Sequence, residues 1–168
     1  MAIVKHRDQR VVVLIDVQNL YYSARHLYGR KVNFKEILKT AVARRHLIRA
    51  IAYVVRTESG EEQPFFNALV RAGIETKVKD LQIFLGGAKK ADWDVGISVD
   101  AIRLAQLVDT IVIISGDGDF IPLVEYLKNQ GRQVEVASFG RSSSQKLKDV
   151  VDDFLDLGDE PERFLFKK

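Results

Sequence analysis

The stretch "TIVIISGDGDF" (residues 110–120) decides how the rest of the chain is interpreted. It begins as a branched apolar run, which is typical of a buried strand. Two aspartates, Asp117 and Asp119, follow directly, and residues 119–130 then have the pattern of a helix that Gly131 closes at its C-cap. Because carboxylates repel each other, their pairing at the mouth of a buried strand needs a physical reason.

Strands and helices alternate on both sides of this stretch. Further strands are predicted at residues 10–16, 47–55, 74–80, 133–139 and 152–157. Further helices are predicted at residues 19–29, 33–45 with Asn33 as N-cap, 64–72, 93–107 and 142–150, and residues 81–92 are expected to be irregular or a hairpin. This alternation predicts a three-layer α/β/α fold with a mainly parallel central sheet.

The composition is that of an ordinary globular protein. The chain has 168 residues, which suits a single domain over 1–168, and 46% hydrophobic with 29% charged residues makes intrinsic disorder unexpected. The net charge is +3, and the first fifty residues carry 11 Lys and Arg against 3 Asp and Glu. This basic first third could face phosphates, although a solvated surface is the commoner explanation.

Several classes of protein are excluded or disfavoured. The chain contains no cysteine, which excludes disulfides, thiol catalysis and cysteine-ligated zinc. No apolar run approaches the roughly 20 residues that span a bilayer, so no membrane partner is expected. The first ten residues lack the apolar segment of a signal peptide, and we therefore expect a cytoplasmic protein.

The aspartates of three separate segments are predicted to meet at one edge of the sheet. Asp16 ends the first strand, and Asp117 and Asp119 follow a second one. In parallel sheets, ligands bind outside the carboxyl ends of the strands. Asp94 and Asp100 lie six residues apart on the preceding helix, which separates them by about 120° around its axis. They cannot both point at one spot unless Asp94 lies in the entry turn. Otherwise, one of them approaches the cluster and the other lies at its rim.

Crowded carboxylates are unfavourable without a cation. Hard oxygen ligands without cysteine favour Mg²⁺ or Mn²⁺, which bind few protein ligands and keep several waters. Such ions, singly or as a pair about 4 Å apart, assist the attack of water on a phosphodiester by lowering the pKa of the water and stabilising the leaving oxygen.

Each of these residues also has a structural alternative. Asp119 and Asp94 could cap helices, and Asp117 could stabilise a tight turn. Asn19 could cap a helix, or could orient water or phosphate near Asp16. Asp16 follows an apolar strand and is the hardest to explain structurally, and the joint placement of the aspartates favours a metal site.

Other polar and aromatic residues support weaker interpretations. His6, His26 and His46 lack metal-ligand spacing, Ser115 has no evident His and Asp partners, and nucleotide-binding glycine motifs are absent. The segment "SFGRSSSQK" (138–146) could bind an anion or cap a helix. Trp93, Tyr21 and Tyr22 could stack on bases or pack in the core, and Arg25, Lys89 and Lys90 could contact phosphates or form a solvated face.

Three ordered motifs resemble the NYN domain family, particularly its LabA-like (DUF88) branch. They lie in "VVVLIDVQNL", "KADWDVGISVDAIRL" and "SGDGDFIPLVEYLKNQGRQVEVASF", and the resemblance covers about residues 10–158, leaving a short C-terminal tail. The family's D-x-x-N element falls on Asp16 and Asn19. Its K-x-x-x-D-V-x-x-x-x-D element falls on Lys90, Asp94, Val95 and Asp100, and its S-G-D-x-D-F element falls on residues 115–120.

The resemblance implies a PIN-like nuclease fold and a ribonuclease that depends on Mg²⁺ or Mn²⁺. Carried over by position, the catalytic and metal-binding set is Asp16, Asp94, Asp117 and Asp119, with Asn19, Asp100 and Ser115 in support. The implied partner is RNA, and association with further copies of the chain stays open.

Two other functions compete with this one. The chain could be a non-catalytic RNA-binding or regulatory adaptor that retains the metal site. It could also be a phosphatase of similar fold, but the haloacid dehalogenase pattern requires D-x-D after the first strand, where this chain has "DVQN" (16–19).

Overall fold

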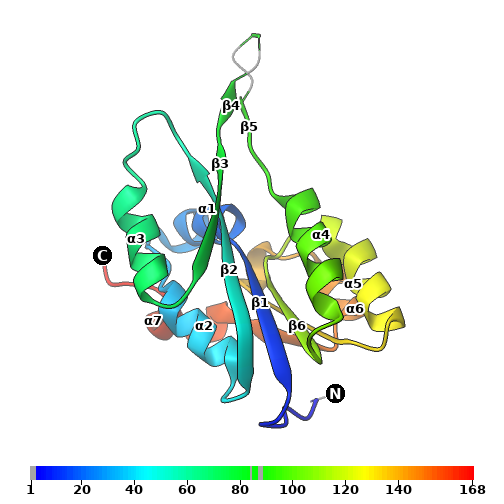
Figure 1. Cartoon of the computed structure of the whole chain (residues 1–168). Coiled ribbons are helices and arrows are strands. Elements are labelled where there is room, and N and C mark those ends of the chain that lie inside the picture. The colour runs from blue at the N-terminus through cyan, green and yellow to red at the C-terminus, as the bar shows by residue number, and fades with distance from the viewer. Residues whose placement is uncertain (1–2, 84, 87–88) are drawn as a thin grey trace.

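A six-stranded sheet forms the centre of the protein (Figure 1). In spatial order its strands are β3 (Glu75–Asp80), β2 (His46–Arg56), β1 (Arg10–Asp16), β6 (Thr110–Ile114), β7 (Gln133–Ser138) and β8 (Asp153–Asp156). Every neighbouring pair is parallel. This computed structural model describes residues 3–83, 85–86 and 89–168. The predicted parallel sheet is confirmed.

Two layers of helices cover the sheet. One face carries α1 (Val17–Tyr28), α2 (Phe34–Val42), α3 (Gln63–Arg71) and α7 (Pro161–Phe164), and the other carries α4 (Asp94–Ala105), α5 (Ile121–Asn129) and α6 (Gln145–Val150). Short 3₁₀ turns occur at η1 (Gly118–Phe120), η2 (Gly140–Ser142) and η3 (Leu157–Asp159). The three-layer α/β/α fold is therefore as the sequence predicts.

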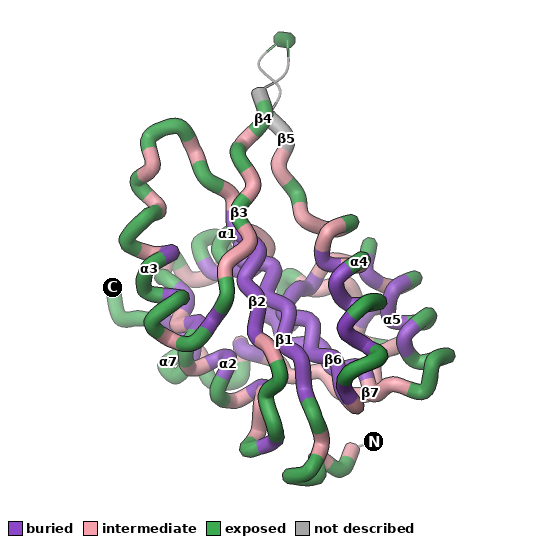
Figure 2. The backbone as a smooth tube through the Cα atoms, viewed as in Figure 1, coloured by how far each residue is buried: buried purple, intermediate pink, exposed green. Residues whose placement is uncertain are grey.

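The central strands separate two hydrophobic cores. Along β1, Val11, Val13 and Ile15 pack into the core under α1 to α3. Val12 and Leu14 alternate with them and pack into the core under α4 to α6. Both faces of the strand are thus buried, and Figure 2 shows β1 in the purple of buried residues over most of its length. This explains why its sequence is uniformly apolar.

Helix α2 ends earlier than the predicted range of 33–45. Its start is as expected, because the Asn33 side chain accepts a hydrogen bond from the Glu36 N–H at 3.2 Å. At the other end, Ala43 and Arg44 adopt positive φ values of 52° and 61°. The guanidinium of Arg45 then donates to the carbonyls of the last turn, which stabilises this early end.

The strand order reverses between β1 and β6. The chain builds β2 and β3 on one side of β1, returns through α4, and then builds β7 and β8 on the other side of β6. Crevices at such switch points are the usual ligand sites of parallel sheets. Register places Ile15 beside Ile114, so the residues that follow each strand emerge next to each other.

Two further segments complete the chain. Strands β4 (Gln82–Ile83) and β5 (Lys89–Lys90) pair antiparallel and form a hairpin that projects beyond the carboxyl end of the sheet (Figure 1). The C-terminal segment forms η3 and α7 and packs back on the body. Among the described residues, no helix combines the length and apolar character needed to cross a membrane.

Candidate metal centre

Asp16 and Ser115 lie side by side where β1 and β6 end. The Ser115 hydroxyl donates a hydrogen bond to the Asp16 carboxylate (Oγ to Oδ2, 3.1 Å) and accepts one from the Asp117 N–H at 3.2 Å. Asp16 is only 8% exposed and Ser115 is completely buried. Ser115 therefore connects the first aspartate to the loop that carries the other two.

Helix α1 begins directly after Asp16, and its first turn holds the same loop. The Asp16 carboxylate caps the helix by accepting a hydrogen bond from the Asn19 N–H at 3.4 Å. The Asn19 side-chain oxygen accepts a hydrogen bond from the Gly116 N–H at 2.9 Å. The structure therefore gives Asn19 a role beyond the two considered from the sequence: its side chain fixes the backbone of the acidic loop.

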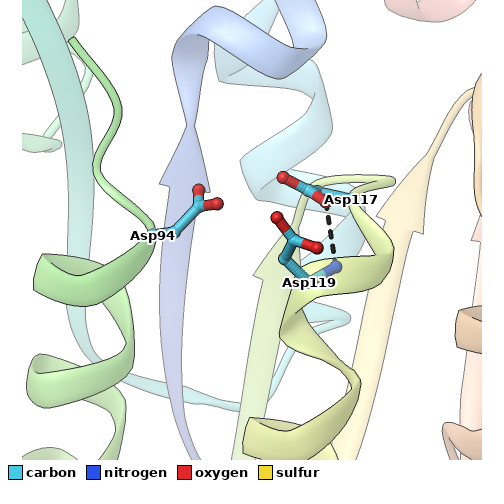
Figure 3. A group of neighbouring side chains, drawn as sticks. All are labelled: Asp94, Asp117 and Asp119. Atoms are coloured by element: carbon cyan, nitrogen blue, oxygen red, sulfur yellow. Dashed lines mark hydrogen bonds between the residues drawn. The ribbon is translucent and has the colours of Figure 1, made fainter. Parts of the chain in front are cut away.

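Asp117, rather than Asp119, caps the turn that follows β6. Its carboxylate accepts a hydrogen bond from the Asp119 N–H at 2.9 Å and so starts η1 (Figure 3). Figure 3 also shows Asp94 pointing from the start of α4 toward these two side chains. Since Asp94 is the first residue of α4, it satisfies the entry-turn condition that lets it reach the cluster.

Three carboxylates come together in one small space. One ligand oxygen from each of Asp94, Asp117 and Asp119 lies within 4.8 Å of the other two. Asp94 and Asp117 are half-buried and Asp119 is exposed, so the group opens to solvent on one side. This openness suits a hard cation that keeps several water ligands.

Burial and mutual repulsion both act on these acids. Burial, mainly, raises the pKa of Asp16 to about 6, and the charges of Asp117 and Asp92 add to the effect despite hydrogen bonds from Asn19 and Ser115. Burial likewise raises the pKa of Asp94 to about 7, with further contributions from the charges of Asp117, Asp16 and Asp92. Asp16 thus acts electrostatically on the group of three, and no ion pair among the described side chains compensates the negative charge of these acids.

Asp92 was missed by the sequence reasoning. It is exposed, and its carboxylate accepts a hydrogen bond from the Asp94 N–H at 3.3 Å, so it lies at the rim of the group. The available signal was the first aspartate in "ADWD" (91–94), which lies two residues before Asp94.

The structure does not bring Asp100 into this group. Its carboxylate accepts hydrogen bonds from the Tyr53 hydroxyl at 2.8 Å and the Lys77 ammonium at 2.7 Å. Burial opposes its ionisation, but these two bonds outweigh burial and lower its pKa. Asp100 therefore fastens α4 to β2 and β3 and lies outside the group of three, while its support of the site stays a prediction.

The remaining candidates divide between core and surface. Trp93 packs beside Tyr53 and donates its indole N–H to the Val54 carbonyl at 3.0 Å, so it has the structural role considered for it. Tyr21, Tyr22 and Arg25 are exposed on α1. The three histidines are exposed, and the side chains of Lys89 and Lys90 lie outside the described part of the chain.

The serine-rich segment packs against the acidic loop. Ser144 caps α6 by accepting a hydrogen bond from the Leu147 N–H at 3.3 Å, so the capping role considered for this segment is present. A β-carbon on Gly116 would lie 2.9 Å from the Ser138 hydroxyl and 3.0 Å from the Ser143 α-carbon. Glycine at this position lets the two loops approach, rather than exposing backbone to a ligand.

Comparisons with known proteins agree over nearly the whole chain. The model of the NYN domain family matches residues 10–158. The low amplitude and bright protein LabA of Synechococcus elongatus is 27% identical over 161 residues, which cover 91% of this chain and 86% of LabA. An uncharacterised protein of Methanocaldococcus jannaschii is 28% identical over 95 residues, or 55% of this chain and 35% of that protein.

A solved structure is also similar. The crystal structure of a protein of unknown function from Vibrio parahaemolyticus matches with a TM-score of 0.86 and 32% sequence identity. The match covers 98% of this chain and all of that one, so the two proteins share the complete fold.

Proposed function

Since this chain belongs to the NYN domain family, we propose that it is a metal-dependent ribonuclease. The family lies within the PIN-like nuclease superfamily, and membership suggests a nuclease. The observation that carries the proposal is the group of Asp94, Asp117 and Asp119, with oxygens within 4.8 Å of one another at the switch point of the sheet. Hydrolysis of RNA phosphodiester bonds is the activity that we propose for this group.

The donor set fits Mg²⁺ or Mn²⁺. Every donor is a carboxylate oxygen, and the chain has no cysteine to favour a softer metal. The raised pKa of Asp94 reflects burial together with negative charge that a divalent cation would offset. A bound ion would supply an activated water and would stabilise charge on the leaving oxygen of the phosphodiester.

The residues around the ion have separate tasks. We assign Asp94, Asp117 and Asp119 as metal ligands. Asp16 is not part of that group of three, and we assign it as the buried carboxylate whose charge adds to theirs. Ser115 and Asn19 hold Asp16 and the loop in place through the bonds described above. The open side of the group, next to exposed Asp119, is where an RNA phosphate would approach.

Cleavage of a panel of labelled RNAs tests the proposal. We expect wild-type protein to cleave in Mn²⁺ or Mg²⁺ and to be inactive in EDTA. Asp119→Asn should reduce the rate by at least about 100-fold, because the metal contributes several kcal/mol to the transition state. Asp8→Asn is the matched control, since this exposed aspartate precedes β1 at the opposite edge of the sheet.

Two outcomes would contradict the proposal. Equal cleavage by wild type and Asp119→Asn would show that cleavage does not require the carboxylate of Asp119. Binding of RNA without cleavage in any divalent metal would favour the adaptor function instead. A parallel DNA panel determines whether the activity is restricted to RNA.

A further inference from the structure

Two adjacent tyrosines on α1 are exposed to solvent. Tyr21 is 45% exposed and Tyr22 is 59% exposed, and their rings meet edge to face with centroids 5.3 Å apart. Among the described residues, the other exposed tyrosine and phenylalanine side chains are Tyr126 and Phe166, which lie on separate elements. Core packing therefore does not explain the pair on α1, because neither ring is buried.

A cationic side chain, that of Arg25, contacts the first of these tyrosines. Arg25 follows Tyr22 by three residues and Tyr21 by four, which places it beside both on the helix surface. Its guanidinium donates a hydrogen bond to the Tyr21 hydroxyl at 3.4 Å. Helix α1 contains no acidic residue, so this face combines aromatic surface with positive charge.

This face adjoins the candidate metal centre. The helix begins at Asp16, and Asn19 in its first turn bonds to the acidic loop. Tyr22 follows Asn19 by three residues and so lies on the neighbouring part of the same helical face. With a rise of 1.5 Å per residue, Tyr22 is about 9 Å along the helix from Asp16. This is about the length of two to three stacked nucleotides, at about 3.4 Å each.

We propose that Tyr21, Tyr22 and Arg25 form a stacking platform for unpaired bases of single-stranded RNA, next to the candidate metal centre. Exposed aromatic rings stack on any base, and a neighbouring arginine contacts the phosphate backbone. Because paired bases in a duplex do not offer their faces, the platform selects single strands. The proposal rests on the proposed function for the identity of the ligand, and it adds which form of RNA is recognised and where.

Binding of a fluorescein-labelled 12-nucleotide single-stranded RNA tests the platform. Fluorescence anisotropy is measured in Ca²⁺, which screens the carboxylates, and a gel confirms that the RNA stays intact. Tyr22→Ala should weaken binding by about 5- to 150-fold, since stacking contributes about 1–3 kcal/mol per base. Tyr22→Phe should bind within about twofold of wild type, because it keeps the ring. Tyr126→Ala removes a ring from α5 that is 45% exposed, as Tyr21 is, and should have no effect.

An abasic oligonucleotide with the same phosphates separates stacking from charge. Wild type should bind it about as weakly as Tyr22→Ala binds ordinary RNA, and the two proteins should not differ on it. Binding of the two oligonucleotides by wild type alone needs no variant, so that part of the test stays informative if a variant fails to fold. The proposal is overturned if wild type binds both oligonucleotides equally, if it does not bind the RNA, or if Tyr21→Ala and Tyr22→Ala bind like wild type.

The two proposals fail separately. Cleavage in Mn²⁺ by wild type, with unchanged binding by the tyrosine variants, would overturn the platform and leave the nuclease. Tyrosine-dependent binding of single strands, with no cleavage in Mn²⁺, would overturn the nuclease and support the platform.

Discussion

At Asp94, burial and neighbouring carboxylates act in the same direction. Together they raise its pKa to about 7, while burial is the main cause that raises the pKa of Asp16 to about 6. Both values exceed the ordinary 3.8 of an aspartate, so the folded protein holds these two protons more tightly than the unfolded chain does. Without a bound cation, folding therefore disfavours the ionised form of these two aspartates relative to the protonated form.

This predicts that the metal-free protein loses stability as pH rises. The stabilisation from the two protons is complete below about pH 4 and is lost as pH rises through about 6 and about 7. Urea unfolding in EDTA at a series of pH values between about 5 and about 8 measures this loss. Added Mn²⁺ should stabilise more at the upper end of this range, because protons compete with the metal for the same oxygens.

Asp94→Asn provides the control for the pH series. Asparagine has nearly the same shape and does not titrate, so the decline between about pH 5 and 8 should be shallower in this variant. An identical decline in wild type and variant would show that other groups cause it.

At the scale of elements, a buried ion pair joins the turn that follows α2 to strand β7. The Arg45 guanidinium donates to both carboxylate oxygens of Glu135 on β7, at 2.8 and 3.0 Å. It also donates to the carbonyl of Ala41 at 2.8 Å and to that of Val42 at 3.0 Å. The two charged side chains are 0% and 4% exposed. Glu135 also pairs with Lys5 at 3.5 Å, whereas Glu135 is the carboxylate that the described residues offer to Arg45.

Glu135→Gln should therefore lower the free energy of unfolding by about 3–5 kcal/mol, because it leaves a buried guanidinium without a counter-charge. Chemical denaturation measures the change. Glu75→Gln is the matched control, since it breaks the Arg49–Glu75 pair, whose side chains are 39% and 51% exposed. That change should lower stability by at most about 1 kcal/mol. Equal effects of the two substitutions would contradict the importance of burial.

At the scale of the whole molecule, the C-terminal segment is part of the folded body. Phe164 is completely buried, and its carbonyl accepts a hydrogen bond from the Asn33 N–H at 2.8 Å. The Phe166 N–H donates to the Lys31 carbonyl at 2.8 Å, and Leu165 forms a bridge with Val32. The last residues thus close over the connection between α1 and α2.

Truncation of this buried ring should destabilise the whole domain. Phe164→Ala should lower the free energy of unfolding by about 3–5 kcal/mol, because it removes a fully buried ring and leaves a cavity. Phe166→Ala, two residues later, removes a ring that is 52% exposed and should change stability by at most about 0.5 kcal/mol. Thermal and urea unfolding compare the two variants, and similar losses would mean that the segment is not held by Phe164.

The local sequence predicts most strands and helices and the placement of three of the site's aspartates. Apolar runs, helical spacing and caps such as Asn33 depend on residues within a few positions of one another, so the sequence predicts them. The rule that parallel strands end at one edge then brings Asp16 close to Asp117 and Asp119 without knowledge of side-chain positions.

Only the tertiary structure decided which distant groups compensate each charge and which rings are covered. Asp94 and Asp100 lie on one helix, yet Asp94 faces the other carboxylates and Asp100 faces Tyr53 and Lys77, which come from β2 and β3. Trp93 is packed while Tyr22 is exposed, although both lie near the acidic residues in sequence. The physical reason is that these outcomes depend on how helices rotate and pack against the sheet, and no local pattern encodes the partner that a side chain will meet.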